Sequence, residues 1–300
     1  MNRIIQKAIN MGFDCNRAEL IREKDGVTVA RLYDNDSTAI LKWFAPGIST
    51  REVTNYSILA SLGVPTLRVI ASCTDAIIIE DMAAASCPFR LAEEKDMSDE
   101  DIARNLAKWY RKLHTSGFSY VQQHGEDMYS EASLFTPENI AKIKRDTGLR
   151  DLPLWRLIDE NYGIIAAHIA AAPMTLTYND FYYTNMAVAR DGTAAMMFDY
   201  NLLGKGHVYS DMRNVEYSLS PAAAAAFRAA YGEYDFSHEA AIDAVISPII
   251  TLHFAYARAE FPDWALPELK NLQNGYKYAV EALLEHEIIP GGAYGTAVRP

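Results

Sequence analysis

The feature that most limits how this chain can fold is a change of sequence pattern near residue 82. Before that point, short runs rich in β-branched and aromatic residues alternate with turn residues. After it, longer stretches carry apolar residues at helical spacing. The pattern predicts an α+β fold whose main sheet lies in the N-terminal part and whose remainder is mostly helical.

Five strands and one inserted helix are predicted within residues 1–82. Asp25-Gly26 and Asp34-Asn35-Asp36 are hairpin turn signals between the first three strands. Ser49 and Thr50 can cap the helix, which we expect to continue to about Leu62. The predicted strands are Ala18–Lys24, Val27–Tyr33, Thr38–Phe44, Leu67–Cys73 and Ala76–Asp81.

Beyond a hinge predicted over Met82–Pro88, helices are expected almost throughout. The first begins at Ser98-Asp99-Glu100-Asp101, because acidic residues in a first turn interact favourably with the helix dipole. The other long helices are predicted over Leu154–Ala171, Ala222–Glu233, Glu239–Glu260 and Pro267–Glu287.

One hairpin interrupts the helical part. Its strands are predicted over Met186–Arg190 and Ala194–Phe198, on either side of Asp191-Gly192-Thr193. A three-residue loop would place Asn185 opposite Asp199, with both side chains on one face of the hairpin. A two-residue loop would shift the register by one and direct them to opposite faces. The sequence leaves both registers open.

Asp180, Asn185 and Asp199 occur in an order typical of phosphoryl-transfer sites. In such sites a D-x-x-x-x-N loop supplies an Asp that accepts the substrate's hydroxyl proton and an Asn that holds Mg²⁺, and a later Asp binds the same ion. Mg²⁺ takes few protein ligands, usually carboxylate or amide oxygens. Taken alone the motif is weak, because Asp180 could cap a helix and Asn185 could serve a turn.

Lys42 strengthens this interpretation. It lies on the third predicted strand between the apolar residues Ile40 and Phe44, where an ammonium group is costly to bury without partners. Glu52, one turn into the following helix, is the expected partner. A Lys–Glu pair between a third strand and a helix positions ATP phosphates in kinases. The alternative is that Lys42 extends to solvent while Glu52 only stabilises its helix.

Composition excludes several other classes. The 300 residues are 50% hydrophobic and 22% charged, which is the balance of a globular protein. We find no apolar stretch long enough for a membrane span, and the charged N-terminus argues against a signal peptide. Three cysteines, Cys15, Cys73 and Cys87, form no CxxC motif, so reduced thiols in a cytoplasmic protein are expected.

Charge is unevenly distributed along the chain. The formal net charge of −11 argues against nucleic acid and anionic membranes as partners. Residues 1–82 carry 9 basic and 10 acidic side chains, whereas residues 83–300 carry 19 and 29. The excess acidity of the second part predicts a cationic small-molecule acceptor, although acidity can also serve solubility alone. The oligomeric state is not predicted.

The segment TYNDFYYTNMAVARDGTAAMMFDYNLLGKGHVYSD resembles the core of the aminoglycoside phosphotransferase and choline kinase family. That family shows H-G-D-x-x-x-x-N, a hairpin, and then I-D-W-E-x-x-G-x-G-x-x-x-x-D. Leu62-Gly63-Val64-Pro65 and Trp109–Gly117 are also similar to family motifs. The residues that match the core motif are Asp180, Asn185, Asp199, Gly204, Gly206 and Asp211.

The resemblance has departures. Tyr178-Asn179 replaces the family's His-Gly, and Asn201 replaces its Glu. The D-F-G and A-P-E signatures of protein kinases and a G-x-G-x-x-G loop are all missing from the sequence, so a small-molecule kinase is expected, with the short Lys24–Val27 turn over the phosphates.

The resemblance implies the two-lobed protein-kinase-like fold, with residues 1–82 as the N-lobe and 83–300 as the C-lobe. It implies ATP or GTP as co-substrate, with the base against the backbone near Glu80 and Met82. Lys42 would hold the phosphates and Glu52 would orient Lys42. Asp180 would accept the proton of the acceptor hydroxyl. Asn185 and Asp199 would bind Mg²⁺, and Asp211 would support the catalytic loop.

Three functions remain open from the sequence. The first is an antibiotic-modifying phosphotransferase, and the second a metabolic kinase for choline, ethanolamine, another amino alcohol or a sugar. The third is a kinase-like binding protein without turnover. Glu126, Asp127, Glu260 and Asp263 are expected near a cationic acceptor. Tyr256 and Phe261 could add cation–π contacts.

Overall fold

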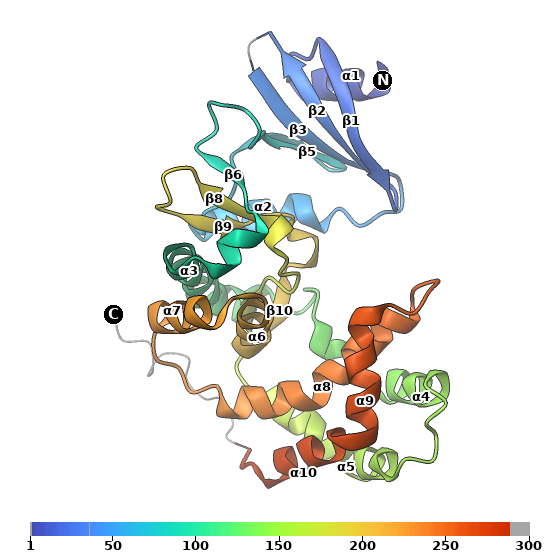
Figure 1. Ribbon diagram of the computed structural model, residues 1–300. Helices are drawn as coiled ribbons and strands as arrows, with labels where there is room; N and C mark the ends of the chain where they lie inside the picture. The colour runs from blue at the N-terminus through green and yellow to red at the C-terminus, as the bar shows by residue number, and fades with distance from the viewer. Residues whose placement is uncertain (1, 36, 289–300) are drawn as a thin grey trace. The chain divides into compact units, whose positions relative to one another are not determined.

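The computed structural model describes residues 2–35 and 37–288, which form two compact units (Figure 1). The hairpin with Asp199 belongs to the same unit as the N-terminal sheet, so this division differs from a cut at residue 82, and the two lobes stay a prediction. The first unit comprises Met1–Gly117, Tyr178–Leu203 and Asn214–Tyr231, and the second Phe118–Thr177, Gly204–Arg213 and Gly232–Pro300.

The first unit contains the predicted five-stranded sheet. All neighbouring strands are antiparallel, in the order β1-β2-β3-β5-β4. Asp25 and Gly26 form the first turn with φ angles of 51° and 76°, and a Cβ on Gly26 would lie 2.5 Å from the side chain of Ile48. Asp36, in the second predicted turn, lies outside the described residues. The strands are β1 (Arg17–Lys24), β2 (Val27–Asp34), β3 (Ser37–Phe44), β4 (Val69–Cys73) and β5 (Ala76–Glu80).

One face of this sheet is covered by a helix that the sequence analysis missed, α1 (Asn2–Asn10). Its buried residues Ile4 and Ala8 pack with Leu32 and Leu41 of β2 and β3. Because Lys42 follows Leu41 on a strand, its side chain points to the opposite face. The sheet thus has one apolar face against α1 and one face that carries the candidate site.

The predicted helix between the third and fourth strands is α2 (Arg51–Ser61), with Thr50 at its N-cap position. No side-chain hydrogen bond from Thr50 caps it, so only the position of the predicted cap is correct. Glu52, Asn55, Tyr56 and Leu59 are its buried residues. Their spacing places them on one face of the helix.

A second small sheet also lies in the first unit. The predicted hairpin is β8 (Met186–Ala189) with β9 (Ala195–Met197), and β8 also pairs with a short strand, β6 (Phe89–Leu91), that was not predicted. The helix α3 (Glu100–His124) begins as expected, because Asp99 Oδ1 accepts hydrogen bonds from the amides of Asp101 and Ile102. The helices α6 (Val208–Ser218) and α7 (Pro221–Tyr231) also contribute.

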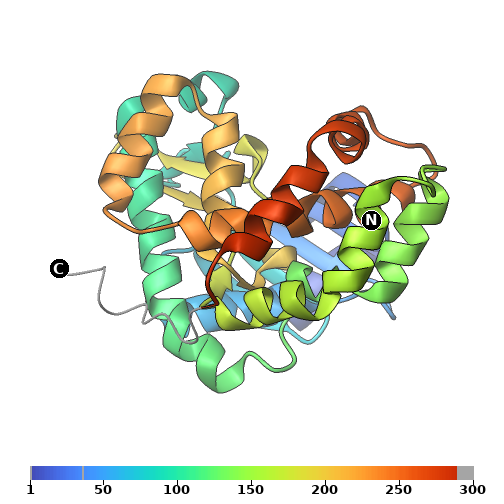
Figure 2. The same cartoon turned by 90° about the horizontal axis from the view of Figure 1, so that it is seen from below.

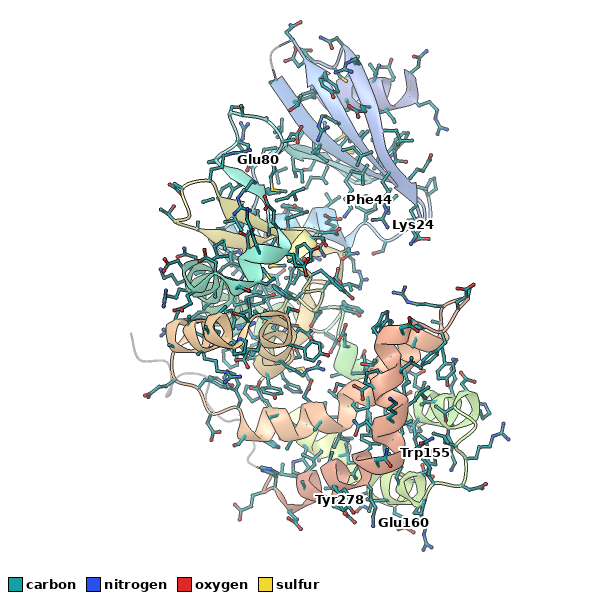
Figure 3. The ribbon with its side chains drawn as sticks, viewed as in Figure 1. Lys24, Phe44, Glu80, Trp155, Glu160 and Tyr278 are labelled. Atoms are coloured by element: carbon teal, nitrogen blue, oxygen red, sulfur yellow. The ribbon has the colours of Figure 1, made fainter. Side chains whose placement is uncertain are left out.

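The helices of the second unit (Figure 2) pack around a separate apolar core that includes Trp155, which is labelled in Figure 3. The last predicted helix is wrong as a single element, because the chain breaks at Gly275 into two helices. A two-stranded sheet joins β7 (Thr175–Thr177) and β10 (Gly204–Gly206). The main helices are α4 (Pro137–Asp146), α5 (Pro153–Ala171), α8 (Ser237–Tyr256), α9 (Leu266–Asn274) and α10 (Tyr276–Glu285).

Within the described residues, none of the helices has both the length and the apolar character needed to span a bilayer.

Candidate active site

The candidate site begins with Lys42 on the open face of β3. Its ammonium forms an ion pair with Oε2 of Glu52 on α2 and a hydrogen bond of 2.7 Å with Oδ1 of Asp199. The Lys42 side chain is 14% exposed and that of Glu52 only 2%, whereas Asp199 is 33% exposed. The predicted Lys42–Glu52 pair is therefore present, and Asp199 joins it from a segment 157 residues away.

Asp199 lies at the start of a sharp turn. It lies two residues after the end of β9 and adopts the left-handed conformation, with φ 62° and ψ 70°. A single 3₁₀ turn, η4 (Tyr200–Leu202), comes next. Left-handed geometry is unfavourable for residues other than glycine, so the surrounding contacts must hold this turn.

Asp180 and Asn185 join the same cluster. Nδ2 of Asn185 donates to the backbone oxygen and to Oδ2 of Asp180, both at 3.3 Å. Asp180 also lies close enough to Asp199 and Lys42 for their charges to shift its pKa. The structure thus brings Lys42, Glu52, Asp180, Asn185 and Asp199 into one polar cluster.

The hairpin register differs from the one that would place Asn185 opposite Asp199. Met186 pairs with Met197 and the loop spans residues 190–193, closed by the Ala189 amide and the Ala194 carbonyl at 2.8 Å. Asn185 therefore lies opposite Phe198, whose amide donates to its carbonyl at 2.9 Å. Asn185 and Asp199 nevertheless both lie near Asp180, because the chain turns away from the β8–β9 pairing at Asp199. The alternation of side chains along a strand does not predict this turn.

Burial and, to a smaller extent, the nearby carboxylate of Asp199 raise the pKa of Asp180 to a net value of about 6. Lys42 and the hydrogen bond from Asn185 oppose this change. A carboxyl group with this pKa is still mostly ionised at neutral pH, and its affinity for protons is far higher than that of an exposed aspartate.

The Lys42–Glu52 pair is strongly coupled. Burial lowers the pKa of Lys42, but the carboxylates of Glu52 and Asp199 more than compensate, so the net direction is upward. Burial raises the pKa of Glu52, while Lys42 opposes the rise. A lysine between two carboxylates remains protonated, which gives the site a fixed positive charge.

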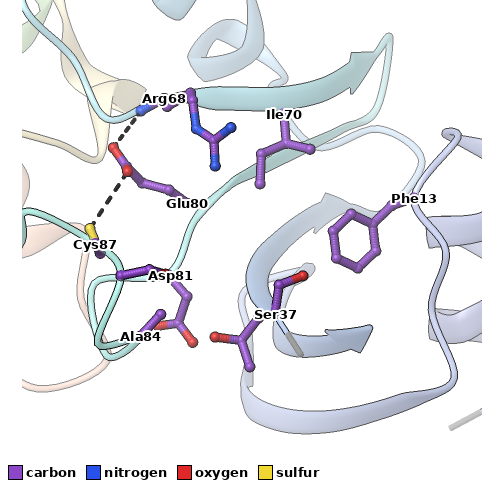
Figure 4. A pocket seen from close by; sticks show the side chains of 10 residues that line it. Phe13, Ser37, Arg68, Ile70, Glu80, Asp81, Ala84 and Cys87 are labelled. Atoms are coloured by element: carbon purple, nitrogen blue, oxygen red, sulfur yellow. Dashed lines mark hydrogen bonds between the residues drawn. The ribbon is translucent and has the colours of Figure 1, made fainter. Parts of the chain in front are cut away.

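Glu80 and Met82, the predicted nucleotide-binding residues, lie near the other end of the sheet from Phe44 and Lys24 (Figure 3). The Glu80 side chain points into a pocket of about 240 Å³ together with Arg68, Cys87 and Phe13 (Figure 4). Its carboxylate accepts from the Arg68 amide at 2.8 Å and from the Cys87 thiol at 3.5 Å. Because Glu80 pairs with Ala39, whose side chain is buried against α1, the Glu80 side chain faces away from Lys42.

Met82 is held by a residue that the sequence analysis did not identify. Arg190, at the loop of the β8–β9 hairpin, donates to the Met82 carbonyl at 2.9 Å and to the Cys87 carbonyl at 3.0 Å. Arg31 on β2 similarly fixes Asp81, with Nε 2.7 Å from Oδ2. The expected hinge is thus tied to both sheets of the first unit. Neither contact has a sequence signal, because each joins residues far apart in the chain.

Two residues outside the predicted site set donate hydrogen bonds to the Asp199 turn. Asn55 lies one turn after Glu52 on α2 and donates to the Tyr200 carbonyl at 2.7 Å. Tyr178, which replaces the family's histidine, donates to the Phe198 carbonyl at 2.5 Å. The i,i+3 spacing of Glu52 and Asn55 on a helix was the available signal for Asn55.

The residues expected to bind the acceptor all lie in the second unit. Glu126, Asp127, Glu260 and Asp263 are exposed. Tyr256 and Phe261 are half-buried with ring centroids 4.9 Å apart, and both pack against the helical core. Asp211 is fully buried in the same unit, and its support of the catalytic loop remains a prediction.

The second unit also buries carboxyl groups of its own. Glu239 accepts hydrogen bonds from the Tyr209 amide at 2.8 Å and the Tyr234 hydroxyl at 2.6 Å. Asp243 forms an ion pair with Arg213 at 2.9 Å. Burial raises the pKa of Glu239 to about 7 and that of Asp243 to about 6. Among the described residues, we find no group of three or more His, Cys, Asp or Glu side chains that could hold a metal ion.

Comparison with known proteins identifies the family. Residues 20–245, about three quarters of the chain, match the model of the phosphotransferase enzyme family. No curated protein matches by sequence. Chains of solved structures match in number, 153 in all.

Three of these solved structures illustrate the likeness. A putative aminoglycoside phosphotransferase from Ralstonia eutropha has 14% identity and a TM-score of 0.64, over 95% of this chain and 98% of the other. Choline kinase LicA from Streptococcus pneumoniae has 15% identity and a TM-score of 0.60, over 95% and 99%. A spectinomycin phosphotransferase solved with ADP and spectinomycin has 12% identity and a TM-score of 0.56, over 94% and 98%.

These findings confirm the α+β, protein-kinase-like fold class and the resemblance drawn from the motifs around Asp180 and Asp199. Because the match extends over most of the chain, from β1 into α8, it includes the sheet with Lys42, the turn at Asp199 and the loop of Asp180. The chain is an enzyme of the phosphotransferase enzyme family.

Proposed function

We propose that this enzyme transfers the γ-phosphoryl group of ATP or GTP to a hydroxyl group of a small, cationic acceptor. The observation that carries this proposal is the contact of Lys42 with both Glu52 and Asp199. In this contact Lys42 is a cation that can bind nucleotide phosphates, and Asp199 is a carboxylate that can bind a metal ion. The spectinomycin phosphotransferase of similar fold was solved with ADP, which supports a nucleotide co-substrate.

The nucleotide-binding roles follow from this cluster. Lys42 holds the phosphates, and Glu52 orients Lys42 from a position that is almost completely buried. Glu80 and Met82 contribute through their backbone, since the Glu80 side chain points into the pocket with Arg68 and Cys87. Arg190 and Arg31 restrain this stretch of backbone.

The donor set around Asp180 fits Mg²⁺. Oδ2 of Asp199 and Oδ1 of Asn185 accept no hydrogen bond from any described residue, and both are hard oxygen donors. Asp199 and Asn185 would hold the ion. When bound, Mg²⁺ neutralises negative charge on the transferred phosphoryl group.

Asp180 is the proposed base. With a pKa of about 6 it is mostly ionised at neutral pH and can accept the proton of the acceptor hydroxyl. Asn185 orients its carboxylate through the hydrogen bond to Oδ2 at 3.3 Å, and a second bond at 3.3 Å goes to the Asp180 backbone oxygen. Catalysis then depends mainly on alignment and on charge neutralisation, which explains why few side chains are needed.

The acceptor is proposed to be cationic because the chain's excess acidity lies beyond residue 82. An aminoglycoside-like compound and an amino alcohol such as choline both satisfy this requirement, and solved enzymes of similar fold include both kinds of kinase. We propose a cytoplasmic location, where the free thiols of Cys15, Cys73 and Cys87 would remain reduced.

A screen for nucleotide consumption tests the proposal. The protein is incubated with Mg²⁺, ATP or GTP, and panels of hydroxylated amines, amino alcohols and neutral sugars, with Asp180→Ala as the matched control. We expect product formation with at least one cationic hydroxylated compound and none with the control. Tight Mg-nucleotide binding with no turnover on any panel would instead favour a binding protein.

A further inference from the structure

The turn that carries Asp199 has an unusual number of side-chain donors directed at its backbone. Residues 197–203 run from the end of β9 through η4, and most of their carbonyl groups bond to a side chain. The Tyr200 hydroxyl donates to Met197, Tyr178 to Phe198 at 2.5 Å, and Asn179 to Leu202 at 3.0 Å. This compensates for the left-handed conformation of Asp199 and for the lack of a regular ladder.

Asn55 differs from these donors because it lies on a helix, α2. Its Nδ2 donates to the Tyr200 carbonyl at 2.7 Å and, more weakly, to the Leu203 carbonyl at 3.4 Å. The residue is 5% exposed. An amide nitrogen has two donor hydrogens, which matches the two carbonyls at the ends of η4.

The position of Asn55 on α2 connects it to the ion pairs of the site. Glu52 precedes it by three residues on the same buried face and contacts Lys42. Lys42 contacts Asp199, which precedes Tyr200. Helix α2 therefore holds the turn twice, through the charges of Glu52 and Lys42 and through the amide of Asn55. The rings of Tyr56 and Tyr200 add an edge-to-face contact with centroids 4.8 Å apart.

We propose that Asn55 is a positioning residue that ties the Asp199 turn to α2, so that the Asp199 carboxylate stays at Lys42 with one oxygen open to the metal of the bound nucleotide. This inference rests on the proposed function. If Asn55 has this role, Glu52 and Asp199 both stay in contact with Lys42. A change that frees the turn from α2 weakens the site for Mg-nucleotide more than for nucleotide alone.

Asparagine is required by this arrangement. Alanine removes both donors and leaves the Leu203 carbonyl without its side-chain partner. Aspartate has the same shape, but at neutral pH it offers no donor and adds a negative charge near Glu52 and Asp199. When protonated, an aspartate regains one donor, so its effect depends on pH. A purely structural role would weaken the binding of Mg-ATP and of metal-free ATP alike.

The experiment compares Asn55→Ala and Asn55→Asp with the parent and with Ser57→Ala, an exposed polar residue on the same helix. Calorimetry measures the affinity for ATP with and without Mg²⁺. We expect both Asn55 variants to lose about tenfold or more in affinity for Mg-ATP and less than about threefold for metal-free ATP. Asn55→Asp should recover relative to Asn55→Ala as the pH is lowered from about 8 to about 5. Ser57→Ala should match the parent.

Amide hydrogen exchange on the nucleotide-free protein gives a readout independent of the metal. The Leu203 amide, which donates to the Tyr200 carbonyl at 3.3 Å, should exchange faster in Asn55→Ala, while the amides of β3 remain protected. Equal losses for both forms of ATP, or parent-like Mg-ATP affinity and parent-like exchange, would overturn the inference. A parent protein that binds no Mg-ATP would refute the proposed function instead, and the exchange data would then decide the role of Asn55.

Discussion

The two units of the molecule both bury carboxyl groups, but they satisfy them differently. In the first unit, Glu52 and Asp199 share the ammonium of Lys42, and Asp199 remains 33% exposed. In the second unit, Glu239 is closed off by the Tyr209 amide and the Tyr234 hydroxyl at 3% exposure. In both units burial raises carboxyl pKa values, that of Asp180 in the first and that of Glu239 in the second, while the neighbouring donors and cations oppose the rise.

This difference distinguishes a carboxylate that can bind a ligand, Asp199, from one that only stabilises the fold, Glu239. A carboxylate that keeps an open oxygen beside a fixed cation can bind a further ligand, at the expense of local stability. A carboxylate whose oxygens are occupied by neighbouring donors can only hold its surroundings together. A perturbed pKa alone does not identify the site, since both units contain such groups. The feature that identifies the site is the partly exposed carboxylate of Asp199 beside Lys42.

The largest effect is expected for Asp180→Ala. Removal of the proposed base should lower kcat by about 10²–10⁴-fold, because proton acceptance from the acceptor hydroxyl is lost. Binding of nucleotide should change little, since Asp180 bonds to Asn185 and has no role toward the nucleotide. Steady-state kinetics and calorimetry measure the two effects. Equal losses in nucleotide binding and turnover would show that the role of Asp180 is misassigned.

Asp199→Asn should have the next largest effect. The variant keeps the size of the side chain but removes the carboxylate beside Lys42 that would ligate Mg²⁺. We expect ATP binding to lose its dependence on Mg²⁺, with an affinity for Mg-ATP about 10–100-fold lower. Titration of ATP binding against Mg²⁺ gives the measurement. If the variant binds Mg-ATP as the parent does, the metal assignment is wrong.

Local patterns predicted the elements of the first unit better than the contacts between them. The five strands and α2 follow from turn residues and from alternation, and each is found within a few residues of its predicted bounds. The α1 helix was missed because only Ile4 and Ala8 are buried in it, so its apolar pattern is short. The strand β6 has three residues and exists through its pairing with β8.

The candidate site was predicted residue by residue but not in its geometry. The motif spacing selected Asp180, Asn185 and Asp199, while the hairpin argument could not choose a register. The meeting of these residues depends on the left-handed turn at Asp199 and on donors such as Asn55 and Tyr178. The Asn55 contact joins segments 145 residues apart, so the i,i+3 spacing from Glu52 marks the shared helix face but not the partner. Tyr178 stands where the family pattern has a histidine, so the motif does not predict its contact.

A third prediction concerns stability and pH in the two units. The pKa of Glu239 is raised to about 7 in the folded protein. The Glu239 carboxyl group therefore stabilises the fold fully at a pH below its pKa in the unfolded chain, and this stabilisation is lost as the pH rises through 7. Glu239→Gln should therefore raise the free energy of unfolding by about 1–3 kcal/mol at pH 8 and by almost nothing near pH 4. Chemical denaturation at both pH values measures this change.

Asp180→Asn provides the matched variant in the first unit. The pKa of Asp180 in the folded protein is also raised, to about 6. Above that pH, the free energy of unfolding of Asp180→Asn should therefore be higher than that of the parent. The two variants should differ in turnover, which Glu239→Gln retains and Asp180→Asn loses. A Glu239→Gln protein that is stabilised but inactive would contradict the distinction between support and site.

The smallest expected effect is the salt dependence of the acceptor reaction. If the acidic second unit attracts a cationic acceptor, kcat/KM for the best acceptor should fall a few-fold when the ionic strength is raised from about 20 mM to about 300 mM, because the Debye length shrinks from roughly 20 Å to about 6 Å. Exposed residues such as Glu260 and Asp263 are the candidates for this attraction. Their removal in Glu260→Gln/Asp263→Asn should flatten the salt dependence while kcat is retained. A neutral sugar phosphorylated best, with no response to salt, would mean that the acidity of this unit serves solubility and that acceptor choice is made by contacts other than charge.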